Sequence, residues 1–136
     1  MIALQWRLLN WCASKHHIVM QEYRIDAANQ ILGRVASRAA FMVRGKASPS
    51  FDPSRIPAIR VIITNTDKLR VTGKKMRQKI YRRHSGYHGG LKEETLEHVI
   101  ERDSRLAMRR AITGMLPKNR LRARLLRHVI LYKGDA

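Results

Sequence analysis

The chain has 136 residues, and its 28 Lys and Arg against 10 Asp and Glu give a formal net charge of +18. This length predicts one domain, and with 44% apolar residues the chain can bury a core, which excludes a wholly disordered basic tail. Such an excess of one charge sign destabilises a compact chain through self-repulsion. The composition therefore predicts a polyanionic partner, with nucleic acid first and an anionic membrane second.

Residues 1–20 are predicted to form an N-terminal arm of unknown role, ahead of a domain over residues 21–136. The apolar start is interrupted by Arg7, no basic cluster precedes it, and it is shorter than the roughly 20 residues that a membrane span needs. An amphipathic arm is the favoured interpretation; a targeting sequence stays open because the arm contains no acid, and Met20 is an alternative start. The single cysteine, Cys12, cannot form an intrachain disulfide, which fits a reducing compartment.

The first half of the chain predicts a strand, a helix and a second strand. Residues 23–26 alternate in polarity and indicate a short strand, and apolar residues recur at helical spacing over 31–43. Residues 48–57 contain three prolines and predict a loop. Residues 59–65 are β-branched and apolar on both faces, which is typical of a central strand covered on two sides.

The second half predicts shorter elements. We expect strands at 68–71 and 79–81 around a turn, then two helices separated by a cap at Asp103 and Ser104, a short basic helix over 119–127, and a last strand over 129–132. Strand, helix and buried strand in this order predict an α/β fold with a right-handed crossover and a largely parallel sheet.

Charge is concentrated in one segment. Between Lys68 and Arg83 there are eight cations and no acid, whereas five of the ten acids lie between Glu93 and Asp103. A soluble surface normally mixes the two signs, so this run favours phosphate binding. Tyr81 and Tyr87 both offer a face on which an exposed base can stack, although a half-buried strand position is slightly favoured for Tyr81.

Patterns of nucleotide, metal and nuclease sites are incomplete in this sequence. The Gly45-Lys46 pair lacks the first glycine and the following hydroxyl of a phosphate loop. His84 and His88 have glycines around them and no third ligand, and His84 with Asp67 lacks the paired carboxylates of a nuclease. We therefore predict no catalytic residue, no metal, no cofactor and no small-molecule substrate.

Ordered motifs carry a family resemblance over about residues 23–133. The most specific are HSGYHGGLK at 84–92 and GMLPKN at 114–119; shorter matches lie at 23–27, 32–37, 44–46 and 71–75. Together they resemble the large-subunit ribosomal protein thirteen family, of bacterial or organellar type. The resemblance implies a structural component of the large ribosomal subunit that binds large-subunit rRNA early in assembly, on a single three-layer α/β/α domain with a four-stranded sheet.

Three departures from the family pattern stand out. Ala58-Ile59 replaces a Gly-Asp pair, residues 121–123 read Leu-Arg-Ala in place of Leu-Gly-Arg, and the sequence stops at Ala136 without a longer tail. The lost arginine is expected to be replaced by Arg122 or Arg124.

The physics of the motifs agrees with RNA contact. Glycines in the 84–90 loop allow backbone to approach phosphate, although the loop is also open to interpretation as a plain glycine-rich turn. The predicted rRNA-binding residues are Arg34, Lys46, Lys68, Lys74, Lys75, Arg77, Lys79, Arg82, Arg83, His84, Ser85, Gly86, Tyr87, Gly89, Gly90, Lys92, Lys118, Asn119, Arg120, Arg122 and Arg124.

The expected partners are large-subunit rRNA and neighbouring ribosomal proteins, with no membrane, in a cytoplasmic or organellar ribosome. Two alternatives remain from the residues alone, an RNA-processing enzyme and a sequence-tolerant nucleic-acid-binding protein. A carboxylate pair or metal beside His84 would favour the enzyme, and equal affinity for duplex DNA would favour the second.

Overall fold

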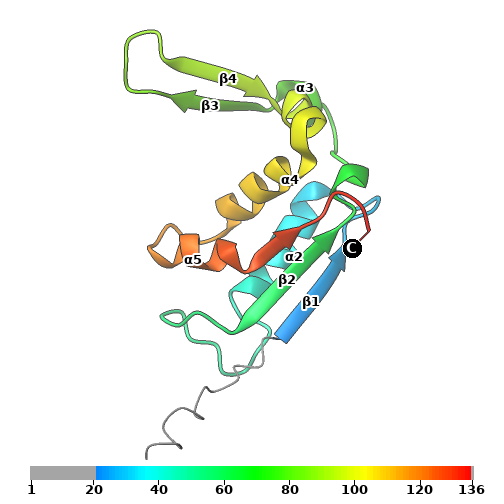
Figure 1. The fold of residues 1–136 in the computed structure, drawn as a ribbon, viewed down its shortest axis with the longest axis vertical. Helices are drawn as coiled ribbons and strands as arrows, with labels where there is room; N and C mark the ends of the chain where they lie inside the picture. The colour runs from blue at the N-terminus through cyan, green and yellow to red at the C-terminus, as the bar shows by residue number, and fades with distance from the viewer. Residues whose placement is uncertain (1–20, 136) are drawn as a thin grey trace, which may run out of the picture.

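The computed structural model describes residues 21–135, and at its centre is a parallel sheet of three strands (Figure 1). The strands, in their spatial order, are β1 (Gln21–Asp26), β2 (Ile59–Thr64) and β5 (Val129–Leu131). The prediction that the 59–65 run is the central strand is therefore confirmed. The predicted N-terminal arm lies outside the described residues.

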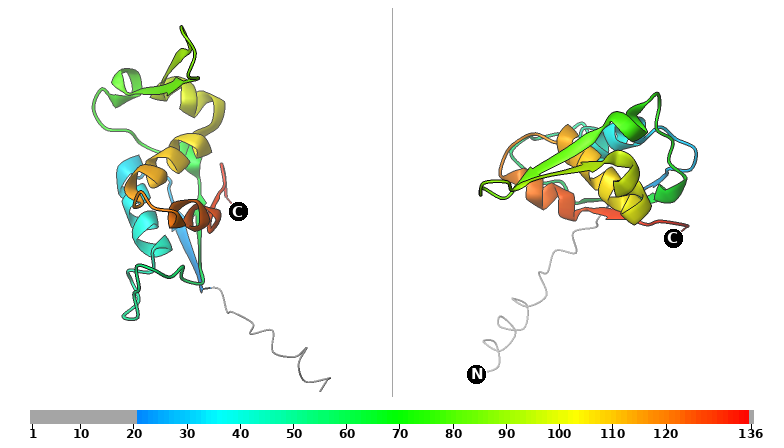
Figure 2. Two further views of the ribbon diagram at one scale, coloured as in Figure 1. Left: turned by 90° about the vertical axis from the view of Figure 1, so that its left-hand side faces the viewer. Right: turned by 90° about the horizontal axis from the view of Figure 1, so that it is seen from above.

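Only one face of β2 is fully buried. Ile59, Val61 and Ile63 are buried, and the alternate residues, including Ile62, are half-buried. The helices α2 (Leu32–Val43) and α4 (Leu96–Met115) lie behind the sheet as drawn in Figure 1, and Figure 2 shows no helix of residues 21–135 over the opposite face.

The described residues thus form two layers, and the predicted third layer is not confirmed. The sequence suggested cover on both faces because Ile62 looks like a core residue. It pairs in register with Ile130 of β5 on the more open face instead.

The fourth strand expected in the sheet is absent from the described residues, so that prediction is wrong. Residues 68–71 contribute one isolated bridge, between Ile31 and Arg70, and part of the short 3₁₀ helix η1 (Thr66–Lys68). The strand predicted at 79–81 does form, but it is β3 (Ile80–His84) of a separate antiparallel hairpin with β4 (Leu91–Thr95). This hairpin projects away from the sheet (Figure 1).

The long helix α4 is broken where a cap was predicted. Asp103 has a non-helical backbone, and its carboxylate accepts hydrogen bonds from the backbone N–H and the guanidinium of Arg105. These bonds hold the pKa of the Asp103 carboxyl below its ordinary value. Residues 96–102 therefore run in a different direction from residues 104–115, as the prediction of two helices required.

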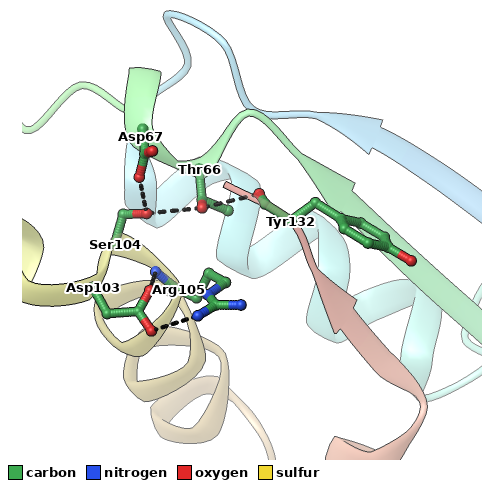
Figure 3. A network of polar contacts seen from close by, with 6 residues as sticks. All are labelled: Thr66, Asp67, Asp103, Ser104, Arg105 and Tyr132. Atoms are coloured by element: carbon green, nitrogen blue, oxygen red, sulfur yellow. Dashed lines mark hydrogen bonds and ion pairs between the residues drawn. The ribbon is translucent and has the colours of Figure 1, made fainter. Parts of the chain in front are cut away.

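A buried polar network ties this break to the ends of the strands (Figure 3). The Ser104 hydroxyl donates to Asp67 Oδ1 at 2.5 Å, and its oxygen lies 2.9 Å from the Thr66 hydroxyl oxygen. The Thr66 hydroxyl also lies 3.0 Å from the carbonyl oxygen of Tyr132, just beyond β5. Because Thr66 and Ser104 are both buried, this network fixes α4 against the carboxyl edge of the sheet.

The apolar core has two parts. The main cluster lies between the sheet, α2, the second half of α4 and α5 (Leu121–Arg127), and it includes Val61, Met108 and Leu125. A smaller cluster around Leu96 and Val99 lies beneath the hairpin and the short helix α3 (Lys75–Gln78). The hairpin is therefore attached to the domain through its own small core.

Candidate nucleic-acid interface

The strands of the hairpin place two cations opposite each other. Arg83 of β3 pairs in register with Lys92 of β4, and no carboxylate among residues 21–135 forms an ion pair with either. Like charges directly opposite destabilise a strand pair. A phosphate bound beside Arg83 and Lys92 would remove this repulsion, so the pair favours an anionic ligand at the outer part of the hairpin.

The neighbouring position is neutralised within the hairpin. Arg82 Nε donates to Glu93 Oε1 at 2.6 Å across the strands, and this hydrogen bond raises the pKa of Arg82. Glu94 accepts from Arg102 at 2.8 Å and lies 3.5 Å from Arg110. Glu93 and Glu94 are therefore both paired with nearby cations.

The loop at the tip of the hairpin is held by its own hydrogen bonds. The Gly86 N–H donates to His84 Nδ1 at 2.9 Å, so the proton of the neutral His84 ring is on Nε2. The Ser85 N–H donates to the Gly90 carbonyl at 3.2 Å, and the Gly90 N–H donates to the Tyr87 carbonyl at 3.0 Å. A folded turn therefore presents the side chain of Tyr87, which is 81% exposed.

Several glycines of this loop are required by its geometry, Gly89 and Gly90 among them. Gly89 has a φ of +70°, which other residues rarely adopt. At Gly90 a Cβ atom would lie 2.0 Å from Ser85 Oγ and 2.9 Å from the Tyr87 carbonyl oxygen. The turn is thus too tight at Gly90 for any side chain.

Tyr81 anchors the root of the hairpin, as its predicted half-buried position implies. Its ring packs against the smaller cluster, with the Arg110 guanidinium 4.6 Å and Lys79 Nζ 5.5 Å from the ring centroid. Burial raises the pKa of Tyr81. Tyr81 is therefore a structural residue, and Tyr87 is the tyrosine available for stacking.

A second cationic region lies where the 44–57 loop meets the turn between α4 and α5. Phe51 lies 5.8 Å from Arg44 and 6.0 Å from Lys46, measured from ring centroid to the charged group. A small pocket of about 240 Å³ is lined by residues of both segments, including Arg44, Phe51, Arg55 and Asn119. Lys46 is thus brought near the turn, although about 70 residues separate the two segments in the sequence.

Arg122 has a structural role in this turn. Its Nε donates to the Pro117 carbonyl at 3.1 Å, and its backbone N–H donates to the Asn119 carbonyl at 3.2 Å. Residues 121–127 are helical, so the arginine at 122 takes the place of the family's glycine without a break. The more exposed cations are those of Lys118, Arg120 and Arg124.

The predicted residues therefore fall into two regions. The hairpin surface comprises Lys74, Lys75, Arg77, Lys79, Arg82, Arg83, residues 84–90 and Lys92. The turn surface comprises Lys46, Lys118, Asn119, Arg120, Arg122 and Arg124 together with Arg44 and Arg55, which the prediction missed. A cation beside an aromatic residue in a proline-rich loop was the available signal for Arg44. Arg34 and Lys68 lie on α2 and η1, outside both definitions.

Within residues 21–135, no group of three or more His, Cys, Asp or Glu is placed to hold a metal ion. No helix in the same range is long and apolar enough to cross a bilayer. Fold and surface together define the class as a small basic α/β protein with a projecting hairpin.

Comparison with known proteins identifies the family. The family model described as Ribosomal protein L13 matches residues 20–136, and the chain belongs to this family. It is 50% identical over 114 residues to large ribosomal subunit protein uL13 of Synechococcus sp. (strain CC9311), covering 84% of this chain and 76% of that protein. The chain is therefore a structural constituent of the large ribosomal subunit and not an enzyme.

More distant relatives include an organellar form. Large ribosomal subunit protein uL13c of Spinacia oleracea is 44% identical over 131 residues, covering 95% of this chain and 52% of that protein. Large ribosomal subunit protein uL13 of Geobacter sp. (strain M21) is 39% identical over 124 residues, covering 91% and 87%. The resemblance noted from the sequence motifs is thus confirmed, in both its bacterial and its organellar type.

Proposed function

We propose that the chain binds large-subunit rRNA through the hairpin surface and the turn surface, and that this contact supports early assembly of the subunit. The observation that carries the proposal is the unpaired like-charged pair of Arg83 and Lys92 behind a glycine-rich tip. In this proposal phosphate oxygens form ion pairs with both cations, and the Tyr87 ring stacks on an exposed base. Neighbouring ribosomal proteins are its further partners.

The two surfaces divide the work in this proposal. The hairpin reaches away from the sheet on a small core of its own, which suits it to enter folded RNA. The turn surface lies on α5 and the 44–57 loop, against the main core through Leu125. Contact at both surfaces would fix the relative position of two RNA segments, which is how a protein without a catalytic centre stabilises an RNA fold.

The first test is equilibrium binding to a large-subunit rRNA fragment and to duplex DNA of equal length. The second test is whether the protein copurifies with large subunits through a high-salt wash. We expect tight, salt-sensitive binding to the rRNA fragment, much weaker binding to DNA, and retention on washed subunits. Equal affinity for DNA would instead indicate a sequence-tolerant binder, and loss from washed subunits would contradict a place in the assembled particle.

A charge-reversal variant of the Arg83 and Lys92 pair gives the site-specific control. Lys92→Glu is expected to relieve the repulsion with Arg83 and to stabilise the hairpin while weakening RNA binding. A variant that is more stable but binds less well separates RNA contact from folding. A variant that binds rRNA as tightly as the wild type would remove the hairpin pair from the interface.

A further inference from the structure

A groove of about 600 Å³ lies between the start of α2, the 70–72 segment, α3, the first residue of α4 and the end of α4. Its apolar lining includes Leu32, Val71, Leu96, Ala111 and Met115. Met115 is 43% exposed, so part of this apolar lining is open to solvent. The volume falls in the range of about 300–1,000 Å³ that is usual for ligand pockets.

Backbone hydrogen bonds fix the walls of this groove. The Leu32 N–H donates to the Arg70 carbonyl at 3.0 Å, and the Arg70 N–H donates to the Gln30 carbonyl at 2.9 Å, which holds the 70–72 segment beside α2. On the other side the Leu96 N–H donates to the Lys79 carbonyl at 2.9 Å, which joins the end of α3 to α4. The groove is thus preformed, so an occupant would bind without ordering these segments.

All charges that line the groove are positive. They are Arg70, Lys75, Lys79 and Arg110, and no carboxylate is among the lining residues. Arg70 and Lys75 form no ion pair with any carboxylate of residues 21–135. An occupant that complements this lining has an apolar body and a negative charge.

The start of α2 adds to the positive potential at the same place. The first turn of α2 contains no acid and its N-cap makes no side-chain hydrogen bond. Gly33 of this turn lines the groove, with no atom within 4 Å of the position of a Cβ. The Leu32 N–H already donates to the Arg70 carbonyl, so the helix start contributes mainly the positive partial charge of its dipole, which adds to that of the four side chains.

Two polar side chains and the position of the groove favour a nucleotide over an acidic protein segment. Thr72 and Gln78 line the groove and can form hydrogen bonds with the edge of a base. An apolar side chain of a protein segment in the same place would leave these polar groups without a partner. Lys75 and Lys79 belong both to the groove and to the hairpin surface. An RNA strand that follows the hairpin surface therefore passes the groove.

We propose that this groove receives the base of an unpaired rRNA nucleotide, with the flanking phosphates on Arg70, Lys75 and Lys79. The inference rests on the proposed rRNA binding and adds to it a site for one base. It assigns a function to Arg70 and to an apolar surface that the charge pattern alone did not single out.

The test fills the groove without changing its charge. Gly114 lines the groove in α4 and has open space at its Cβ position, so Gly114→Leu projects into the groove and also favours the helix. Ser37→Leu, on the exposed face of α2, is the matched control. We expect Gly114→Leu to lose about 10- to 100-fold in affinity for the rRNA fragment, the size of one base contact, with an unchanged salt slope.

A second measurement needs no variant. Ultraviolet crosslinking of the wild-type complex, with mass spectrometry of the linked peptides, should place one unpaired nucleotide on residues 70–75 or 110–115. Replacing that nucleotide by an abasic one should weaken binding to the wild type and leave binding to Gly114→Leu unchanged. Equal affinity of Gly114→Leu and Ser37→Leu, with no crosslink at these residues, would overturn the proposal.

Three further results separate the alternatives. A crosslink from the groove to a neighbouring protein in assembled subunits would overturn the base site in favour of an acidic protein segment. Wild-type binding to rRNA that is no stronger than to duplex DNA would refute the proposed function itself. Salt-sensitive rRNA binding with no effect of Gly114→Leu would refute only the base site.

Discussion

The salt dependence of RNA binding measures how many cations of the hairpin region contact phosphate. Eight cations lie between Lys68 and Arg83, and the ion pair of Arg82 with Glu93 leaves seven without a carboxylate partner among residues 21–135. Each phosphate contact contributes roughly 0.7–0.9 to the slope of log K against log salt. Seven contacts give a slope of about −5 to −6, so a fourfold rise in salt should weaken binding by about 10³- to 10⁴-fold.

The perturbation is the double variant Lys74→Gln/Lys75→Gln. Both side chains lie at the start of α3, and neither forms an ion pair with a described carboxylate. Loss of two phosphate contacts should make the slope shallower by about 1.4–1.8. The folded structure should be retained, because α3 has no buried residue.

The assay is fluorescence titration of an rRNA fragment at four or more salt concentrations, with Arg24→Gln/Arg38→Gln as the control. The control variant loses the same net charge at exposed positions outside both surfaces. An unchanged slope in the Lys74/Lys75 variant would place the RNA elsewhere. An equally shallow slope in the control would show that net charge, and not local contact, controls binding.

Three further predictions test the core, the loop and the buried network. Val61→Asp should unfold the domain, since an unpaired buried charge costs several kcal/mol. Ile62→Asp, on the more open face of β2, should lower the melting temperature but leave the domain folded. Thermal melting that shows the larger loss for Ile62→Asp would contradict the burial assigned to β2. Gly89→Val should weaken rRNA binding at fixed salt more than His84→Gln does, because of its positive φ; chelator-sensitive RNA cleavage lost in His84→Gln would favour an enzyme instead. Ser104→Ala should lower the free energy of unfolding by about 1–3 kcal/mol in urea titrations, and a loss below 0.5 kcal/mol would show that the network is dispensable.

Strong periodicity made much of the fold predictable. The helix over 31–43 and the central strand over 59–65 repeat apolar residues at the spacing that their burial requires, and both formed within one or two residues of the expected ends. The cap at Asp103 was also predictable, since its carboxylate binds the backbone of the next turn locally. Such local signals need no knowledge of the rest of the chain.

The placement of the 68–95 region was not predictable in the same way. Leu69 and Val71 alternate with cations as strand residues do, but their backbone runs beside the start of α2 and does not join the sheet. The strands of the hairpin each contribute a single half-buried residue, Tyr81 and Glu94. Strands as exposed as these have too little apolar surface to pack within a parallel sheet. For this reason neither of them could serve as the fourth strand that was expected in the central sheet.

The turn surface was out of reach for a different reason. Nothing local in the 44–57 loop indicates that it meets residues 117–121, because this contact depends on how α2 and α4 pack against each other. Sequence motifs therefore identified the cations of each segment, and only the tertiary structure identified which of them share a surface.

The way the hairpin is attached suits this exposed element to the proposed RNA contact. Its root is held by the Tyr81 ring between Lys79 and Arg110 and by the hydrogen bond from Leu96 to Lys79, while its tip is closed by bonds within the loop. Both ends are thus ordered before RNA arrives, which lowers the entropy lost on binding. The repulsion between Arg83 and Lys92 lies between these two fixed ends. In the proposed complex a phosphate would relieve this repulsion, so the stability that the free hairpin lacks there would contribute to the binding free energy.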